Sequence, residues 1–281
     1  MDLEQLLREF SAHQQSVQSV VKLLKEISRL DQNRMENLSK LKAQVTKLEE
    51  IIKQLGQGGS HVQNLADWVS QYKRTLETTA EEIRKRFGTE LEQELKKLGL
   101  SLSGQYPELK AGLFTIEVDF DQWKVTLWYG PKQERLAQHP FSVRKITSQI
   151  EKEKQKLGSQ LPEEQLFEKL REAYYRASGM KHGEPAPIIE VLAELSYLLQ
   201  SPRFLQDPRR ENYRSYSRAD FSYDLFRIRK FQSNTLFASK LHLTVATRAH
   251  TKRRSGFLWV PDDESGKGTT YSHLYFEEGT K

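Results

Sequence analysis

Basic residues interleaved with aromatic residues dominate one stretch of the sequence, and this mixture is its strongest indication of chemistry. Residues 201–260 contain 13 lysines and arginines but only four acidic residues. Arginine donates forked hydrogen bonds to phosphate and stacks on bases, and aromatic rings stack on unpaired bases. The stretch therefore predicts a surface for DNA or RNA. Its predicted contact residues are Arg203, Arg209, Arg210, Tyr213, Arg214, Tyr216, Arg218, Arg227, Arg229, Lys230, Arg248, Lys252, Arg253 and Arg254.

The basic stretch also allows two roles that do not involve nucleic acid. The whole chain has 44 basic and 38 acidic residues, a net charge of +6, and its first 200 residues hold equal numbers of both. The arginines could therefore pair with acidic side chains elsewhere in the chain, or they could bind an acidic surface of another protein. We favour a nucleic-acid partner, because a local basic surplus attracts polyanions.

Two histidine patterns resemble those of enzymes that cleave phosphodiesters. Arg176 and His182 have the Arg-x(4–6)-His spacing of HEPN ribonucleases. That resemblance implies a histidine that takes the 2′-hydroxyl proton and an arginine that supports it. His242-Leu243-Thr244-Val245 resembles one half of the paired motif of 2H phosphoesterases, and His273-Leu274-Tyr275 is the later candidate for the second half. We favour a loop position for His182 and a structural role in a strand for His242.

Acidic residues and a glycine-rich loop complete the candidates for catalytic or ligand-binding chemistry. Ser265–Thr270 resembles the end of a phosphate-binding loop, but Pro261 stands where such a loop has its first glycine, so a flexible hairpin loop is expected. A set of acidic residues in expected turns could hold magnesium, although solvated acids are common in turns. The absence of cysteine excludes disulfides and thiol nucleophiles. The sequence thus predicts no metal and no cofactor, and it favours a non-enzymatic role, with Arg176 and His182 as the alternative catalytic pair. The acidic set is Asp119, Asp121, Asp262, Asp263 and Glu264.

The amino-terminal sequence has the periodicity of a coiled coil. From Leu3 to Leu55, mostly apolar residues recur at alternating spacings of three and four, which places a narrow seam along one side of a helix. Asp31 and Arg34 interrupt this seam. The interruption predicts a helix break or a stutter at residues 31–33, or a buried polar layer that fixes the oligomeric state. The seam predicts oligomerisation through Leu24, Ile27, Leu38, Leu41, Val45, Leu48 and Ile52.

A second helical run follows a glycine-rich break at residues 56–59. Ser60 is a good N-cap, and the run is expected to end at Gly88, with a short helix after Thr89. Residues 1–100 therefore predict a coiled-coil helical hairpin. The second helix is shorter than the first seam, so part of that seam needs a second copy of the chain or another protein.

The composition changes near residue 100, and residues 101–281 predict a compact α+β domain with a basic face at 201–260. A basic turn from Arg248 to Arg254 joins two expected strands, which allows a winged-helix-like arrangement. Residues 201–220 read as irregular, and 221–231 alternate only loosely. The expected elements are a hairpin at 113–120 and 123–129, helices at 141–157, 162–178 and 188–199, and strands at 241–247, 255–260 and 271–276.

The layout predicts a non-enzymatic coiled-coil subunit of a larger intracellular assembly that binds DNA or RNA. It would suit an accessory protein of a bacterial defence or genome-maintenance system. A nuclease with an unfamiliar site and a pure scaffold are the alternatives. No apolar run reaches the length of a membrane span, and the first residues lack the pattern of a signal peptide, so a cytoplasmic location is expected.

Overall fold

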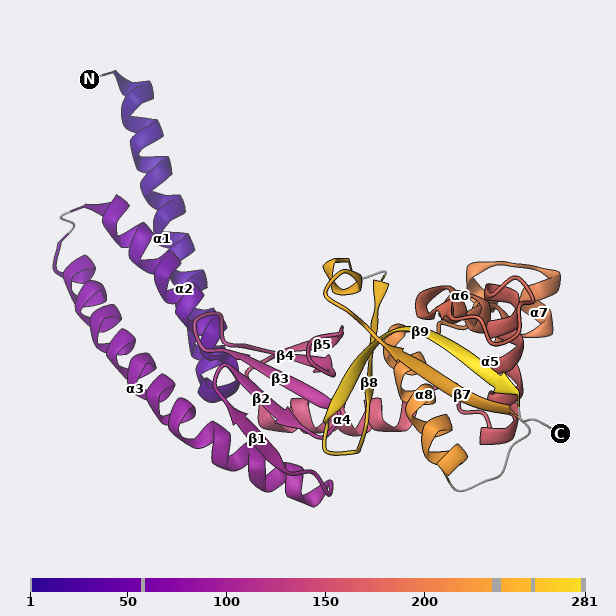
Figure 1. The fold of residues 1–281 in the computed structure, drawn as a ribbon. Coiled ribbons are helices and arrows are strands. Elements are labelled where there is room, and N and C mark those ends of the chain that lie inside the picture. Colours follow the sequence, from indigo (N-terminus) through magenta and orange to yellow (C-terminus); the bar gives the residue numbers. More distant parts are fainter. Residues whose placement is uncertain (1, 57–58, 234–238, 254–255, 279–281) are drawn as a thin grey trace. The chain divides into compact units, whose positions relative to one another are not determined.

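The computed structural model describes residues 2–56, 59–233, 239–253 and 256–278 (Figure 1). The fold is α+β, as the sequence predicted: long amino-terminal helices come first, and two antiparallel sheets with further helices follow. The chain divides into two compact units. The helical unit comprises Met1–Gln93, Asp119–Val125 and His139–Val143, and the mixed unit comprises Glu94–Val118, Thr126–Gln138 and Arg144–Lys281.

The amino-terminal seam is split between two helices, α1 (Leu3–Asp31) and α2 (Arg34–Leu55), which lie side by side (Figure 1). The chain reverses at residues 32–33, so the predicted break is the correct alternative and the seam does not form one continuous helix. Aspartate and asparagine favour helix ends because their side chains compete for backbone hydrogen bonds. Asn37 Nδ2 donates to the Leu30 carbonyl at 3.1 Å and closes the turn.

The third helix, α3 (Ser60–Lys97), runs without a break through Gly88, so the predicted end at that glycine is wrong. A glycine inside a helix costs about 1 kcal/mol relative to alanine. Phe87 and Leu91 on either side are only 2% and 0% exposed. Burial of such side chains outweighs the helical cost of one glycine.

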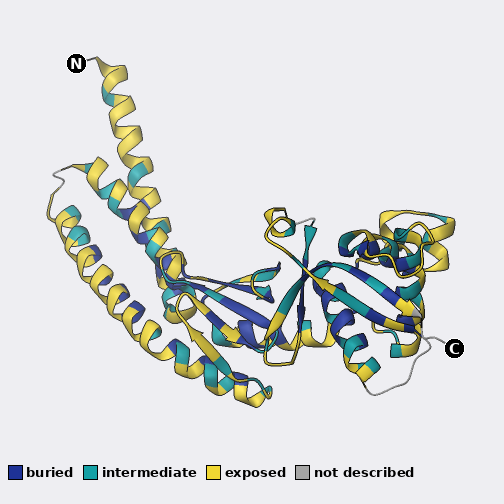
Figure 2. Ribbon diagram, in the orientation of Figure 1, coloured by how far each residue is buried: buried dark blue, intermediate teal, exposed yellow. Residues whose placement is uncertain are grey.

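Helices α2 and α3 run antiparallel, since Lys42 pairs with Glu77 at 3.3 Å while Glu49 pairs with Lys73 at 2.8 Å. The chain's own helices already bury most of the seam residues from which oligomerisation was predicted, and Leu24 and Ile52 are half-buried. The open part of the seam lies instead in the first half of α1 (Figure 2). The buried members are Ile27, Leu38, Leu41, Val45 and Leu48.

Asp31 fastens the α1–α2 turn to α3. It accepts hydrogen bonds from Arg34 Nε at 2.7 Å and from the Tyr72 hydroxyl at 2.6 Å. The hydrogen bond from Arg34, with that from Tyr72, holds the pKa of Asp31 below its ordinary value. A lowered carboxyl pKa stabilises the fold above the ordinary pKa, and this stabilisation is lost as the pH falls through the lowered value.

We therefore expect Asp31→Asn to lower the free energy of unfolding of the helical unit by about 1 kcal/mol at neutral pH. The difference between wild type and variant should shrink as the pH falls from about 5 to about 2, because the wild-type carboxylate becomes protonated. Urea unfolding followed by far-ultraviolet circular dichroism measures both values. A difference that stays constant over this pH range would show that the carboxylate's charge is not involved.

The mixed unit contains a five-stranded antiparallel sheet in the order β1-β2-β3-β4-β5. The predicted hairpin is confirmed, and its two strands are β3 (Phe114–Asp119) and β4 (Lys124–Tyr129). Strands β1, β2 and β5 were not predicted: β1 and β5 have no buried residue, and β2 alternates exposed with buried residues over only four positions. Helix α4 (Val143–Lys156) follows this sheet, as predicted. The strands are β1 (Leu102–Gln105), β2 (Glu108–Ala111), β3 (Phe114–Asp119), β4 (Lys124–Tyr129) and β5 (Glu134–Pro140).

The remainder of the mixed unit is a group of helices with a second antiparallel sheet, an arrangement compatible with the winged-helix-like one that the sequence allowed. Two helices flank a short strand, a third helix follows, and the last strand pairs with strands on both of its sides in the order β6-β9-β7. The elements are α5 (Glu163–Ala177), β6 (Ala186–Pro187), α6 (Ile188–Leu198), α7 (Pro202–Gln206), a 3-10 turn (Arg210–Asn212), α8 (Arg218–Ser233), β7 (Ser239–Val245), a 3-10 turn (His250–Lys252), β8 (Leu258–Pro261) and β9 (Gly268–Glu278).

The segment between β7 and β9 differs from the β-hairpin that the sequence suggested. Strands β7 and β8 do not pair with each other, because Tyr271 of β9 lies between Val245 of β7 and Leu258 of β8. The basic turn therefore lies in the long connection between β7 and β9. Strand β8, which is part of this connection, pairs with the edge of β9 that faces away from β7. Residues 201–220, expected to be irregular, include α7 and a 3-10 turn.

Helix α8 was missed because its apolar residues do not lie on one side. Phe221, Leu225 and Ile228 share one face and are 0% exposed, but Ala219 and Phe226 on the other side are only 1% and 8% exposed, and the polar Ser222 and Asp224 are buried as well. Helix α5 and strand β8 both contact α8, and most of its residues are buried, whereas its last turn is partly exposed (Figure 2). A helix buried on several sides lacks the 3.6-residue apolar period by which helices are recognised.

Candidate nucleic-acid interface

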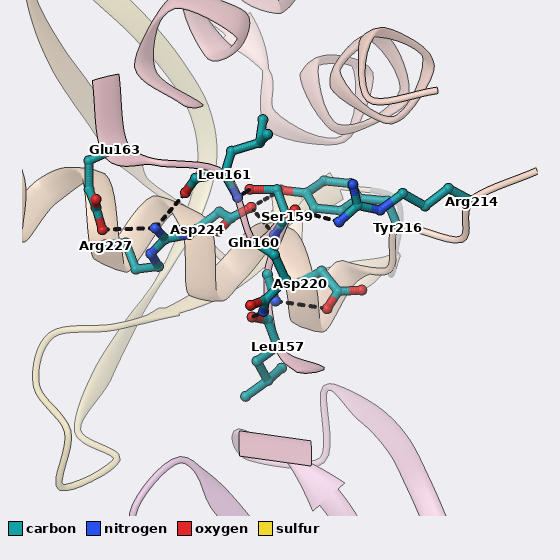
Figure 3. Close-up of polar contacts among 11 residues, drawn as sticks. Leu157, Ser159, Gln160, Leu161, Glu163, Arg214, Tyr216, Asp220, Asp224 and Arg227 are labelled. Carbon is teal, nitrogen blue, oxygen red and sulfur yellow. Dashed lines mark hydrogen bonds and ion pairs between the residues drawn. The ribbon is translucent and has the colours of Figure 1, made fainter. Parts of the chain in front are cut away.

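A buried polar network joins α8 to the loop between α4 and α5 (Figure 3). The Asp224 side chain, 1% exposed, accepts hydrogen bonds from the Ser159 amide at 2.8 Å and from the Tyr216 hydroxyl at 2.8 Å. Asp220 accepts the Gly158 amide at 3.0 Å. Burial raises the pKa of Asp224 and that of Tyr216. This network is structural, because its members bond one another in the interior.

Arg227 and Arg214 belong to the same network, although the sequence assigned both to nucleic acid. Arg227 donates to Asp224 at 3.0 Å, to the Leu161 carbonyl at 2.7 Å and to Glu163 at 2.8 Å. The hydrogen bond from Arg227 keeps the pKa of Glu163 below its ordinary value. Arg214 donates to the Ser159 carbonyl. These two arginines are therefore engaged within the chain, which is the first of the two alternatives to a nucleic-acid contact.

The remaining basic residues of α8 also have partners inside the mixed unit. Arg229 pairs with Asp262 at 3.0 Å and Lys230 with Glu264 at 3.1 Å, both on the loop between β8 and β9. Arg218 donates to the Phe257 carbonyl and lies over its ring at 5.9 Å. In a helix-turn-helix module the second helix enters the major groove. Here most of that helix, α8, is buried and its basic groups have partners, although Lys230 in its last turn is exposed.

The aromatic residues of the stretch mostly face the interior. Tyr216 is 8% exposed, and Phe221 and Phe226 are 0% and 8% exposed. Tyr213 is 49% exposed, with its ring 5.6 Å from that of Phe204. Basic and aromatic residues therefore alternate because surface and core positions alternate along α8 and the segment before it. Of the two tyrosines predicted to contact nucleic acid, only Tyr213 lies at the surface.

Two groups of predicted contact residues are exposed. The first group lies on the insertion between α6 and α8, where Arg209 pairs with Asp207 at 2.9 Å. The second group lies on the turn after β7, which we call the wing tip, residues 246–253. Except for Arg209, these bases have no acidic partner among the described residues. Arg254 lies outside the described residues. The bases of these groups are Arg203, Arg209 and Arg210 in the first, and Arg248, Lys252 and Arg253 in the second. Arg214 and Lys230 are exposed as well, but they bond Ser159 and Glu264.

The wing tip has an ordered backbone that presents its bases. Ala246 N–H donates to the Thr270 carbonyl of β9 at 2.8 Å, which anchors the start of the turn. The Thr247 amide donates to His250 Nδ1 at 3.3 Å, and a 3-10 turn covers His250–Lys252. Lys252 is the last residue of that turn and Arg253 follows it, and both are exposed. A constrained turn loses less conformational entropy when it binds than a free loop does.

The HEPN-like pair does not share a site in the structure. Arg176 pairs back along α5 with Glu172 at 2.5 Å. His182 lies in the loop after α5, as expected, with Nδ1 3.1 Å from the Tyr175 hydroxyl. Each residue thus has its own local partner. General acid–base catalysis would require both side chains to converge on one reacting group.

The two strand histidines do share a surface. In the β7–β9 register, His242 lies opposite Tyr275 and Thr244 lies opposite His273. Residues directly opposite each other, and those two apart, point to the same face of a sheet. The rings of His242 and Tyr275 stack at 4.9 Å. Burial, together with the nearby His250, lowers the pKa of His273.

The acidic candidates have structural roles near their own loops. Asp119 accepts the amides of Asp121 and Gln122 at 2.9 Å and 2.8 Å and so closes the β3–β4 turn. Asp262 bonds Arg229 and Thr269. Within the described ranges, no three histidine or acidic side chains are grouped as metal ligands. In that same part of the chain, no helix combines the length and apolarity of a membrane span.

Sequence reasoning missed the residues that hold α8 in place. The Trp259 amide donates to Gln133 at 2.6 Å, and Glu134 accepts the Ala219 amide at 2.8 Å. Ser222 donates to the Trp259 carbonyl at 2.6 Å. Isolated polar residues that bond distant backbone groups leave no local sequence pattern, so only the fold reveals them.

The chain has no match among known proteins: no protein-family model, no curated protein and no solved structure matches it.

Proposed function

We propose that this protein is a non-enzymatic, coiled-coil subunit that binds duplex nucleic acid through its sugar–phosphate backbone. The observation that carries the proposal is the wing tip, where Arg248, Lys252 and Arg253 are exposed on an anchored turn and have no acidic partner among the described residues. Bases freed from internal pairing are the ones that can replace condensed counterions on a polyanion. The second exposed group, on the α6–α8 insertion, adds further phosphate contacts.

The burial of the aromatic side chains favours a duplex over a single strand. Single-strand binding without sequence preference depends on exposed rings on which successive bases stack. Tyr216, Phe221 and Phe226 are buried, and Tyr213 packs beside Phe204. The exposed basic groups offer phosphate contacts without a stacking platform. Binding through phosphates alone is expected to ignore base sequence.

The covered state of α8 supports backbone binding rather than base reading. A recognition helix needs a free face for the major groove. Helix α8 contacts α5 and β8 and is buried along most of its length, and Arg229 and Lys230 near its end pair with Asp262 and Glu264. We therefore assign the winged-helix-like fold a scaffolding role that holds the wing tip. The same proposal places the protein in the cytoplasm, with its nucleic-acid partner.

Fluorescence anisotropy with labelled oligonucleotides tests this function. We expect two duplexes of equal length and unrelated sequence to bind within about threefold of each other, and a single strand of the same length to bind more weakly. A Tyr213→Ala variant should leave duplex binding unchanged. Preference for one duplex sequence, stronger binding to the single strand, or no binding to any oligonucleotide would contradict the proposal.

A second candidate, a phosphodiester-cleaving enzyme, is favoured by one observation. His242 and His273 share the outer face of the β7–β9 pair with Thr244 and Tyr275. Two imidazoles at diagonal positions, about 7–8 Å apart at their Cα atoms, could supply an acid and a base to one phosphate. Cleavage of RNA or DNA by the wild type that is lost in both His242→Ala and His273→Ala would favour the enzyme. If the wild-type chain leaves the RNA and DNA uncleaved, the result supports the non-enzymatic function.

A further inference from the structure

The first half of α1 exposes a row of large apolar side chains. Leu3, Leu7 and Phe10 are 70%, 59% and 72% exposed, and Val17 and Val21 are 45% and 46% exposed. They continue the seam that α2 covers further along the helix, where Ile27 is 2% exposed. Exposed apolar residues that recur on one face of a helix, here in two groups on either side of residues 11–16, are typical of an interaction site.

The charges of α1 are divided between its two ends. Asp2, Glu4 and Glu9 lie near its start, with Arg8 between them, whereas Lys22 and Lys25 lie beyond the exposed row. The residues from 10 to 21 carry no lysine, arginine or acid. Two parallel copies in register would place like charges side by side. Two antiparallel copies place the acidic start of each helix beside the lysines of the other, which is electrostatically favourable.

The seam also fits itself in the antiparallel direction. Because the seam spacing alternates between three and four residues, it has two kinds of position, a and d. In an antiparallel coiled coil each a position lies beside a d position of the other helix, and a register centred on residues 11–12 gives this pairing here. It places Leu3 beside Val20 of the second copy, Leu6 beside Val17, and Phe10 beside His13. Ser11 and Ala12 mark the centre of this register along the helix and are not seam positions. The overlap spans the exposed row and ends next to Val20, which the chain's own helices already bury to 9% exposure.

We propose that residues 3–21 of α1 bind the same segment of a second copy in antiparallel orientation. In the proposed function, the partner of the coiled coil is therefore a second copy of the same chain. It does not depend on nucleic acid, so it can be tested without any. Each dimer carries two wing tips, and a duplex long enough to reach both would bind more tightly through the higher effective concentration.

Cross-linking of single cysteines tests the orientation, because the chain has no cysteine of its own. The proposed register places residue 4 level with residue 19 of the second copy, whereas two residues 4 are about 22 Å apart along the axis. We expect a short bis-maleimide to join chains in a mixture of Glu4→Cys and Ser19→Cys, and to join neither variant alone. Linkage of each variant to itself would show a parallel dimer and overturn the proposal.

A charge placed in the exposed row tests the surface itself. Phe10→Asp should weaken self-association at least tenfold, measured by analytical ultracentrifugation, because a seam carboxylate cannot stay hydrated in the dimer. Phe10 is 72% exposed, so its replacement should leave the helical content unchanged. Ser11→Asp adds the same charge beside the seam and should leave association within about twofold. A wild-type chain that is monomeric at tens of micromolar, or equal effects of the two variants, would also overturn the proposal.

Discussion

Replacing Arg248, Lys252 and Arg253 with alanine is expected to weaken duplex binding about 100-fold at about 0.1 M salt. Each base that contacts a phosphate releases a condensed counterion, so three lost contacts should also make the log–log salt dependence shallower by about 2 to 3. The variant should fold normally, because all three side chains are exposed and the turn is held by Ala246 and Thr247 instead.

The control for this experiment removes the same charge elsewhere. Lys152, Arg171 and Arg176 lie on α4 and α5, and both arginines pair with glutamates of their own helix. Their replacement by alanine should change duplex affinity by less than about threefold, since it alters only the net charge. If the control weakens binding as much as the wing-tip variant does, the interaction depends on net charge and the wing tip is not the interface.

The second large effect is expected at Asp224. Asp224→Ala should lower the free energy of unfolding of the mixed unit by about 3–5 kcal/mol, because it leaves buried donors of Ser159, Tyr216 and Arg227 without their acceptor. Asp224→Asn should be milder, since burial raises the pKa of this carboxyl and an amide keeps one acceptor without the buried charge.

Urea unfolding followed by tryptophan fluorescence measures this effect, with Trp128 and Trp259 as reporters in the mixed unit. Asp207→Ala is the matched control, because Asp207 pairs with the exposed Arg209 and such pairs contribute about 0–1 kcal/mol. We expect the midpoint to move strongly for Asp224→Ala and hardly for Asp207→Ala. Equal small shifts would show that the network in Figure 3 contributes little to stability.

Elements with a strong local period were predictable from the sequence. Helices α5 and α6 were predicted nearly to the residue, because each buries one regular face. The β3–β4 hairpin was predicted from two alternating strands joined by a short turn. The break in the amino-terminal seam was also indicated, since Asp31 and Asn33 prefer helix ends. In each case the information lies within about 20 residues of chain.

The elements that were missed depend on distant parts of the chain. Helix α8 has no single apolar face, because both β8 and α5 contact it. The expected pairing of β7 with β8 fails because β9 inserts between them, and no local pattern around the wing tip records that. Gly88 suggested a helix end, yet the buried Phe87 and Leu91 hold α3 together.

The candidate interface was predictable in location but not in detail. The sequence placed it within residues 201–260, and exposed basic groups at the wing tip and the α6–α8 insertion lie there. The sequence could not separate surface bases from internal ones. Arg227 and Arg229 resemble Arg248 in sequence context, but Glu163, Asp224 and Asp262 neutralise the first two in the fold.

The salt dependence of duplex binding by the wild-type chain tests the central proposal most directly. Anisotropy titrations between about 50 and 200 mM salt should give a straight log–log plot with a slope of about −3 to −5, which corresponds to phosphate contacts by the exposed bases. The slope should be the same for two unrelated sequences. Affinity that does not change with salt over this range would contradict binding through phosphates and, with it, the function proposed for the wing tip.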